Sequence, residues 1–493
     1  MSAVDTAWLR MDTPANLMMI VGVEIFDRPI SYRVLARRLR ERLLAYDRFR
    51  QRVVPEADGF AWEEDGRFRL SRHVRKVKLR GKADDAALQA LVGKLAGEAL
   101  DPDHPLWRFD LVENYRGGRA VIVRIHHCIA DGIALVRVML SLGDEAPAEA
   151  GGAPARDTPA EPGAAPAARH SPPASRGMFD PVMEQALRAA EVVGAALGQT
   201  LEIARDGDAR EAVAAVAGRA VMDALRIGLM LEDSPTSLKG KPQGTKAVAW
   251  NDPMPLAEVK AVCRVLGVSV NDILLSGVAG AVHRYLERRG EDTAGKELRA
   301  MVPVNLRGAD EPPTLGNRFG LVPLTLPIGI GNPLERVYEV RRRMNELKEG
   351  YQGPIAFAIL NAIGMAPRVV QTLVLDYLAQ KGTAVMTNVP GPPEPMSIFG
   401  RRLSRMMFWV PQSGDIGVGV SILSYDGGVQ FGLITDTALC AQPGQIIDEF
   451  QPEFERLVLM LSMLPRELVG AGLDAREVER RLFREPSGRR RRA

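Results

Sequence analysis

Cysteine, histidine and long apolar runs are scarce in this 493-residue chain, and each scarcity excludes a class of protein. The three cysteines, Cys128, Cys263 and Cys440, are too few and too scattered for a disulfide framework, which fits a reducing compartment. The six histidines and three cysteines show no metal-ligand spacing, so we expect no metal and no resident cofactor. The most apolar long stretch, residues 212–231, is interrupted by charged side chains and does not predict a transmembrane helix.

The amino-terminal residues do not predict a signal peptide. The first residues, MSAVDTAWLRMDTP, include Asp5, Arg10 and Asp12 and have no apolar signal-peptide core. The hydrophobic content of 46% and charged content of 25% are typical of globular domains. We therefore expect a cytoplasmic protein, soluble or peripheral on a membrane, with no nucleic-acid partner.

The composition changes sharply in the middle of the chain. Residues 143–177 are dominated by Ala, Pro and Gly, which cannot bury enough apolar surface to offset the entropy of ordering, and they predict a flexible linker. The sequence predicts one domain over residues 1–142, a helical connection over 178–240, a second domain over 241–484 and a basic tail over 485–493. Strands and helices occur in similar mixture before and after the linker, which favours two similar α/β halves with one active site between them.

Local patterns predict the main elements. We expect strands at 17–26 and 384–388, helices at 31–53, 84–100, 256–266, 273–288, 334–348, 353–364, 366–380 and 445–464, and a hairpin formed by 416–423 and 429–435. The hairpin rests on the strong turn signal Tyr425-Asp426-Gly427-Gly428. Ser269 or Asn271 is expected to cap the helix that follows, and His283 is expected to be structural.

The stretch from Val121 to Leu142, VIVRIHHCIADGIALVRVMLSL, carries the best chemical signal. It begins as an apolar strand, continues through His126 and His127, and acquires helical spacing after Asp131-Gly132. Because side chains alternate along a strand, the two imidazoles should point to opposite faces, so only one should reach a substrate. Asp131 on its own fits a helix cap, and a lone histidine at a strand end is usually structural.

The whole pattern H-H-x-x-x-D-G, however, resembles the active-site motif of acyl-CoA-dependent acyltransferases related to chloramphenicol acetyltransferase and to peptide-synthetase condensation domains. Further stretches occur in a fixed order: PLW at 105–107, SVND at 269–272, MVPVNLR at 301–307, GNRFG at 316–320 and TNVPGP at 387–392. Together with the opening DTAWLRMDTPANLMMIVG, this set resembles the bacterial wax ester synthase/acyl-CoA:diacylglycerol acyltransferase family over nearly the whole chain.

The resemblance implies two chloramphenicol-acetyltransferase-like domains, each a mixed sheet flanked by helices, enclosing a substrate channel. It implies esterification of a long-chain alcohol or diacylglycerol by a fatty acyl-CoA, with acyl-CoA as substrate. By motif, His127 is the catalytic base, and His126 and Asp131 complete its motif. The residues expected to bind substrate or support the site are Gly132, Trp107, Asn271, Asp272 and Asn317. Trp107 could equally be a core anchor, and Asn271 could only cap its helix.

Other readings stay open at this point. Cys128 beside a histidine could form an acyl-enzyme, although a small packing residue is the preferred interpretation. A condensation-type acyltransferase that uses carrier-protein thioesters, or a non-catalytic lipid-body protein, would also fit a related fold. The sequence identifies neither the oxyanion donor nor the preferred acceptor.

The carboxyl-terminal tail accounts for the positive net charge of the chain. Its four arginines, Arg489 to Arg492, exceed the formal net charge of +3. The tail fits either a solvated end or a peripheral anchor on a membrane or lipid-body surface.

Overall fold

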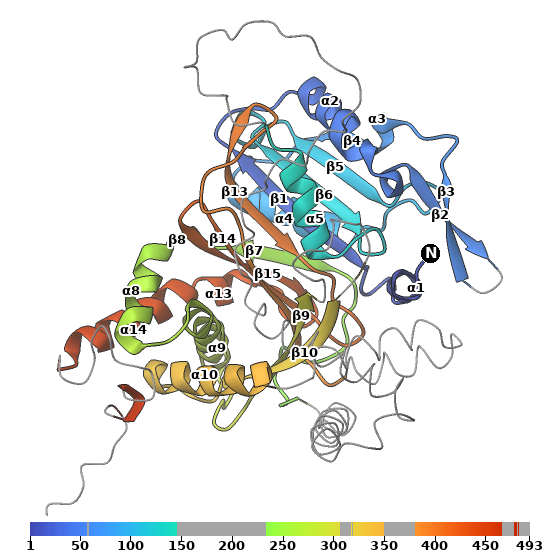
Figure 1. Cartoon of the computed structure of the whole chain (residues 1–493). Helices are drawn as coiled ribbons and strands as arrows, with labels where there is room; N and C mark the ends of the chain where they lie inside the picture. Colours follow the sequence, from blue (N-terminus) through green and yellow to red (C-terminus); the bar gives the residue numbers. More distant parts are fainter. Residues whose placement is uncertain are drawn as a thin grey trace, which may run out of the picture.

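The computed structural model describes residues 1–56, 59–144, 233–305, 317, 319–349, 380–465, 478–480 and 482. Residues 145–177 of the expected linker, most of the helical connection, the helix at 353–364, nearly all of the helix at 366–380 and the basic tail lie outside these residues. The described parts form two mixed sheets flanked by helices, as the sequence predicted (Figure 1).

The first sheet has the strand order β12-β13-β1-β6-β5-β4. Its strands are β1 (Met19–Phe26), β4 (Val74–Val77), β5 (Trp107–Val112), β6 (Ala120–His126), β12 (Ser397–Ile398) and β13 (Arg401–Trp409). β1 lies between β6 and β13 and is antiparallel to both, whereas β4 and β5 are parallel. The expected strand at 17–26 is therefore present, starting two residues later.

Two strands of this sheet come from the carboxyl-terminal half, so the expected boundary at residue 142 does not separate the two sheets. β1 is buried along almost its whole length. Without β13, one edge of β1 would present unpaired backbone groups, and β13 satisfies them. The first half of the chain is thus completed by a strand nearly 400 residues later in the sequence.

The second sheet has the order β10-β9-β11-β14-β15-β7, with β8 paired to β15. Its strands are β7 (Lys246–Trp250), β8 (Met254–Pro255), β9 (Leu298–Asn305), β10 (Phe319–Leu326), β11 (Ala384–Pro390), β14 (Val418–Tyr425) and β15 (Gly428–Asp436). The hairpin of β14 and β15 is confirmed, with Tyr425 opposite Gly428. Its two turn residues, Asp426 and Gly427, have φ of 47° and 73°, the left-handed pair that a tight two-residue turn requires.

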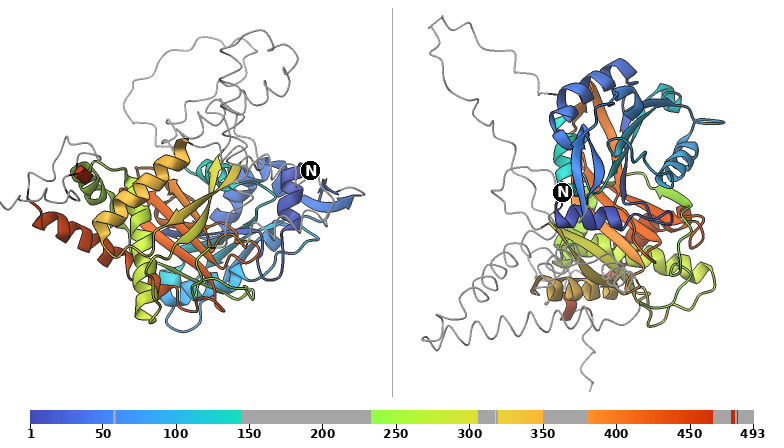
Figure 2. Two further views of the ribbon diagram at one scale, coloured as in Figure 1. Left: turned by 90° about the horizontal axis from the view of Figure 1, so that it is seen from below. Right: turned by 90° about the vertical axis from the view of Figure 1, so that its right-hand side faces the viewer.

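Helices cover both sheets (Figure 2). They are α1 (Ala3–Arg10), α2 (Tyr32–Arg42), α3 (Leu70–His73), α4 (Asp85–Ala96), α5 (Gly132–Ser141), α8 (Leu256–Leu266), α9 (Val270–Arg288), α10 (Pro333–Glu349), α13 (Gly444–Ile447) and α14 (Phe450–Met463). In the first sheet, α2 and α5 share one core with the face that carries Val121, Val123 and Ile125, and α4 packs on the other face. His127 therefore follows a strand that is buried on both faces.

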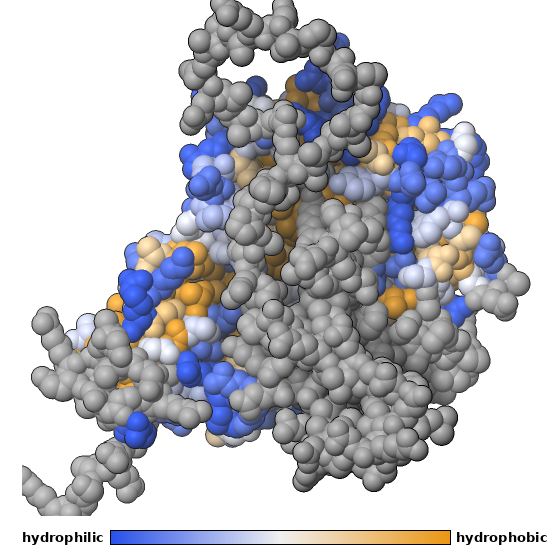
Figure 3. Space-filling model, viewed as in Figure 1, coloured by the Kyte–Doolittle hydropathy of each residue, from blue (hydrophilic) through white to orange (hydrophobic). Residues whose placement is uncertain are grey.

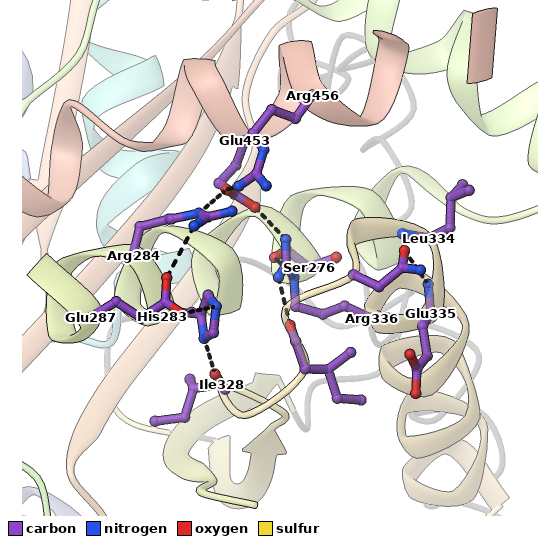
Figure 4. A network of polar contacts seen from close by, with 12 residues as sticks. Ser276, His283, Arg284, Glu287, Ile328, Leu334, Glu335, Arg336, Glu453 and Arg456 are labelled. Carbon is purple, nitrogen blue, oxygen red and sulfur yellow. Dashed lines mark hydrogen bonds and ion pairs between the residues drawn. The ribbon is translucent and has the colours of Figure 1, made fainter. Parts of the chain in front are cut away.

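A buried ion pair joins the helices of the second half (Figure 4). The guanidinium of Arg336 on α10 contacts the Glu453 carboxylate on α14 and donates to the backbone oxygens of Ser276 and Ile330, at 3.1 and 2.7 Å. A Cβ on Gly280 of α9 would collide with this pair, so the glycine lets the helices approach. His283 is structural as expected: it is buried, and its Nδ1 lies 2.8 Å from the Ile328 oxygen.

Two expected helices are interrupted. The helix predicted over 31–53 ends at Arg42, continues as two 3₁₀ turns, and gives way to a hairpin of β2 (Gln51–Glu56) and β3 (Gly59–Glu64). The sequence Arg52-Val53-Val54-Pro55 favours this change, because β-branched residues suit strands and proline cannot continue a helix. The final helix is divided into α13 and α14 at Asp448 and Glu449.

Within the described ranges, no single helix is long and apolar enough to cross a bilayer. The consecutive helices α8 and α9 pass that test only as a pair, and they meet at an angle of 103°.

Candidate active site

The histidine pair lies where β6 gives way to α5. The His126 N–H donates to the Leu106 oxygen at 2.9 Å, and the His127 N–H donates to the Met18 oxygen at 2.7 Å. The turn then leads to Asp131, whose carboxylate accepts from the Ala134 N–H at 2.9 Å and caps α5. The strand and the capped helix thus hold the buried turn at both ends.

The imidazole of His127 is held by groups from distant parts of the chain. It stacks on Trp8, with ring centroids 4.4 Å apart and planes inclined by 21°. Its Nδ1 lies 2.8 Å from Oδ1 of Asn317. Nδ2 of Asn317 donates to Oδ1 of Asp5 and to the backbone oxygen of His127, both at 2.8 Å. Asp5 in turn forms an ion pair with Arg48 at 3.0 Å.

Arg48 also supports the turn itself. Its Nη1 donates to the backbone oxygens of Ile129 at 2.7 Å and of Cys128 at 3.3 Å. Its guanidinium lies over the ring of Trp62, 5.2 Å from the centroid. One arginine therefore links the Asp5 carboxylate to the backbone that carries the histidine pair.

Burial decides the charge of His127. It is 3% exposed, and desolvation lowers its pKa to about 4, against the opposing effects of Asp131 and Asn317. The ring is consequently neutral at neutral pH, and a neutral imidazole is the form that accepts a proton.

His126 has different surroundings. Its Nδ1 accepts from the Cys128 N–H at 3.2 Å, and its Nε2 lies 3.8 Å from the Asp12 carboxylate. Burial disfavours the charged form of His126, whereas the neighbouring Asp12 carboxylate favours it, and the pKa of His126 lies above its ordinary value. The two neighbouring rings therefore differ in partners and in proton affinity, and only His127 has the low proton affinity of a neutral base.

Of the residues predicted to support the site, Asn317 contacts His127, whereas Asn271 and Asp272 lie in α9 of the second half. Ser269 caps α9, and Asp272 completes a capping box by accepting from the Ser269 N–H at 2.8 Å. The interpretation of Asn271 as a cap is wrong, since Ser269 occupies that position; Oδ1 of Asn271 instead accepts from Nδ2 of Asn388 at 2.8 Å. This contact joins the SVND stretch to TNVPGP on β11.

Trp107 is a buried anchor of the amino-terminal core. Its Nε1 donates to the Phe49 oxygen at 2.9 Å, and its ring stacks on His73 with centroids 4.5 Å apart. A cavity of about 390 Å³ lies beside it; its charged and titratable lining residues are Arg67, Arg72, His73, Asp101, Asp103, His104 and Arg108. The polar lining does not suit a fatty chain.

Gly132 opens α5 directly after the Asp131 cap. A Cβ built there would meet no described atom within 4 Å, so packing among the described residues does not explain the glycine. Cys128 is fully buried in the amino-terminal core, as a small packing residue would be.

Three residues around His127 were not singled out from the sequence. Asp5 and Trp8 belong to the opening stretch that contributed to the family resemblance, but no role was assigned to them. Arg48 lies in a stretch predicted as plain helix, and no local pattern marks it. Contacts over such long sequence separations arise only in the folded chain.

Comparisons with known proteins agree with this geometry. Residues 1–274 match the model of the wax ester synthase/diacylglycerol acyltransferase catalytic domain, and residues 315–458 match that of the WS/DGAT C-terminal domain. A probable diacylglycerol O-acyltransferase, tgs1, of Mycobacterium tuberculosis is 29% identical over 402 residues, covering 80% of this chain and 81% of the relative. A putative diacylglycerol O-acyltransferase of Mycobacterium bovis, Mb0919, is 26% identical over 476 residues, covering 93% of this chain and 90% of the relative.

Solved structures show the same fold. The wax ester synthase/diacylglycerol acyltransferase from Marinobacter aquaeolei VT8 superposes with a TM-score of 0.65 at 20% identity, covering 94% of this chain and all of that one. The first condensation domain of the calcium-dependent antibiotic synthetase superposes with a TM-score of 0.53 at 15% identity, covering 94% of each chain. With both halves of the chain matched by the models of one family, the chain belongs to the wax ester synthase/diacylglycerol acyltransferase family.

Proposed function

We propose that this protein is an O-acyltransferase that moves a fatty acyl group from acyl-CoA directly to the hydroxyl of a diacylglycerol or a long-chain alcohol. The observation that carries the proposal is His127, a buried neutral imidazole directly after β6, at the histidine that the H-H-x-x-x-D-G motif assigns as the base.

In this mechanism the acceptor oxygen attacks the thioester carbonyl carbon while Nε2 of His127 takes the hydroxyl proton. The tetrahedral intermediate then collapses, the carbon–sulfur bond breaks, and the imidazolium returns the proton to the leaving thiolate. The products are the ester and free CoA. A positioned general base contributes about 10²–10⁴-fold to such a transfer. Because thiols titrate near 8.5, the leaving group needs little acid assistance.

The other readings of the sequence are less favoured. Both family models that match are those of wax ester synthases and diacylglycerol acyltransferases, rather than of carrier-protein-dependent condensation enzymes. A non-catalytic lipid-body protein would have no need for a neutral buried histidine whose ring is held by Trp8 and Asn317. Turnover of free acyl-CoA without a carrier protein would exclude both of these alternatives.

The direct test offers radiolabelled palmitoyl-CoA with either a long-chain alcohol or a diacylglycerol to the purified protein, followed by separation of the lipid products. We expect His127→Ala to abolish ester formation and His126→Ala to lose less, with both variants folded by circular dichroism. An active His127→Ala variant beside an inactive His126→Ala variant would transfer the base role to the other ring. Absence of ester with both acceptors in the parent protein would refute the proposed activity.

The cellular site belongs to the same proposal: a cytoplasmic protein bound peripherally to the inner membrane face or to lipid inclusions, where its lipid substrates dissolve. Apolar side chains gather near α8 and α14 in Figure 3, and on α14 Leu459 and Met463 are 61% and 76% exposed. Co-sedimentation with anionic vesicles should fall in a Leu459→Glu variant if α14 contacts lipid. Deleting Gly488 to Ala493 tests the basic tail in the same assay, and unchanged binding in both variants would exclude these contacts.

A further inference from the structure

We propose that Asn317, backed by Asp5 and Arg48, is a positioning residue that fixes which nitrogen of His127 carries the proton. This inference rests on the proposed acyl transfer, since it assigns the basic nitrogen for that reaction. It gives a role to one residue of the GNRFG stretch and to two residues that carried no role from the sequence.

The first step is the orientation of the Asn317 amide. Its Nδ2 faces two acceptors at 2.8 Å, the Asp5 carboxylate and the His127 backbone oxygen. Neither group can donate a hydrogen bond when the carboxylate is ionised. A reversed amide would place its oxygen against both of them, so the arrangement of acceptors fixes Nδ2 on that side and Oδ1 toward the imidazole.

The second step is the state of the imidazole. Oδ1 of Asn317 can only accept, and it lies 2.8 Å from Nδ1 of His127, so Nδ1 must carry a hydrogen. In a neutral ring the lone pair is then on Nε2. The resting protein thus holds His127 in the tautomer whose Nε2 can accept the acceptor hydroxyl's proton.

The third step is the burial of this chain of contacts. Asp5 is 0% exposed and Asn317 is 5% exposed, so solvent does not readily replace their hydrogen bonds. Arg48 balances the Asp5 charge at 3.0 Å and also holds the turn that follows His127. Moving any one of Asn317, Asp5 or Arg48 would leave a buried polar group of its neighbour without a hydrogen-bond partner. Each residue therefore stabilises the position of the others.

The choice of asparagine has a chemical consequence. A carboxylate at the same place would stabilise the imidazolium and would raise the pKa of His127. The neutral amide selects the tautomer without adding a charge next to the ring, which fits the low pKa of about 4. The Asp5 charge, one hydrogen bond further away, still keeps Oδ1 of the amide directed at the Nδ1–H of His127, while the ring gains its second proton on the opposite nitrogen, Nε2.

Asn317 and Asp5 also come from distant parts of the chain, 312 residues apart. Asn317 directly precedes β10 in the second sheet, whereas Asp5 lies in α1 and His127 follows β6 of the first sheet. The tautomer of the base is therefore set only when both halves are in place.

The test compares Asn317→Ala and Asn317→Asp with Asn114→Ala as the matched control. The Asn114 amide also makes two hydrogen bonds, to the backbone of Leu79, but it lies before β6, at the end of the strand remote from His127. We expect Asn317→Ala to lower kcat by about 10²–10⁴-fold, the contribution of a correctly positioned general base, with a smaller change in KM. Asn114→Ala should lose stability but keep kcat within about threefold.

Asn317→Asp supplies a readout that a purely structural role would not move. Its added carboxylate should shift the acidic limb of the kcat–pH profile to higher pH than in the parent protein. An unshifted limb in this variant, or equal kcat losses in Asn317→Ala and Asn114→Ala, would overturn the proposal.

A measurement without turnover separates this inference from the proposed function. Nitrogen-15 spectra of the histidine side chains, with His127 assigned by its loss in His127→Ala, should show the Nδ1–H tautomer in the parent and a changed tautomer population in Asn317→Ala. The Nε2–H tautomer in the parent would refute the inference whatever the activity. The Nδ1–H tautomer in a parent protein that forms no ester would uphold the positioning and refute only the acyl transfer.

Discussion

Glu24, a buried carboxyl group in the middle of β1, should make the stability of this protein depend on pH. It is 4% exposed, and its Oε2 has no hydrogen-bond partner among the described residues. It lies opposite Met406 of β13 and Val121 of β6, so the residue facing it on each neighbouring strand is apolar. Burial raises the pKa of Glu24 from 4.5 to about 8.

The sign of the effect follows from the direction of this shift. The folded state keeps the proton up to about pH 8, whereas the unfolded chain releases it above 4.5. The contribution of Glu24 to the free energy of unfolding is therefore fully present below pH 4.5 and is lost as the pH rises toward 8. At about 1.4 kcal/mol per pH unit, the loss reaches about 5 kcal/mol across the whole window and about 3 kcal/mol at pH 7.

Glu24→Gln tests this reasoning, because the amide has similar size and no charge to lose. Burying the amide adds a cost that does not vary with pH, so the diagnostic quantity is the slope rather than the absolute stability. In denaturant unfolding between pH 5 and 9, the variant should gain stability over the parent as the pH rises to about 8, and the gain should then level off. The exposed Glu63→Gln variant is the control and should follow the parent. A difference between Glu24→Gln and the parent that stays constant with pH would refute the buried, protonated carboxyl.

Other perturbations have equally definite outcomes. Arg336→Ala leaves the Glu453 carboxylate buried with fewer partners and should cost about 3–5 kcal/mol in denaturant unfolding. Asp131→Asn retains an oxygen that can cap α5, so the melting temperature should change little; lost activity at an unchanged melting temperature would show a direct catalytic role. Cys128→Ser should keep sequential kinetics and most of the transfer rate, whereas ping-pong kinetics in the parent and an inactive variant would indicate an acyl-enzyme. With the pKa of His127 at about 4, the parent's rate should be flat from pH 6 to 8 and fall only as the pH approaches 4.

Local chemistry explains what could be predicted from the sequence. The strand that ends at His126, the turn and the helix that begins at Gly132 were predicted in place, because an apolar run, a capping Asp and helical spacing each act over a few residues. The hairpin after Tyr425 followed from its Asp-Gly turn for the same reason. These elements are determined within short windows, so a single sequence suffices to find them.

The rest of the site depends on contacts that no short window contains. Asn317 lies 190 residues from His127 and 312 from Asp5, and the sequence alone gave it only a general supporting role. Arg48 sits in a stretch where leucine spacing suggested a helix, but the chain turns there to form a hairpin. Strand β13 was missed altogether: its buried and exposed positions do not alternate regularly, because one end is solvated and the other enters the core.

The interleaving of the two halves gives a physical reason for the precision of the site. β13 belongs to the first sheet and is followed along the chain by β14 of the second, so one connection ties the sheets together. At that junction Trp409 packs so close to β15 that a Cβ on Gly432 would lie about 3.0 Å from the indole. A side chain at position 432 would force the sheets apart or displace the tryptophan. The hydrogen bond of Asn317 to His127 has little tolerance for such a shift, since a change of even 1 Å would break a 2.8 Å contact. The packing that joins the two halves therefore also keeps the His127 ring within hydrogen-bonding distance of the Asn317 amide.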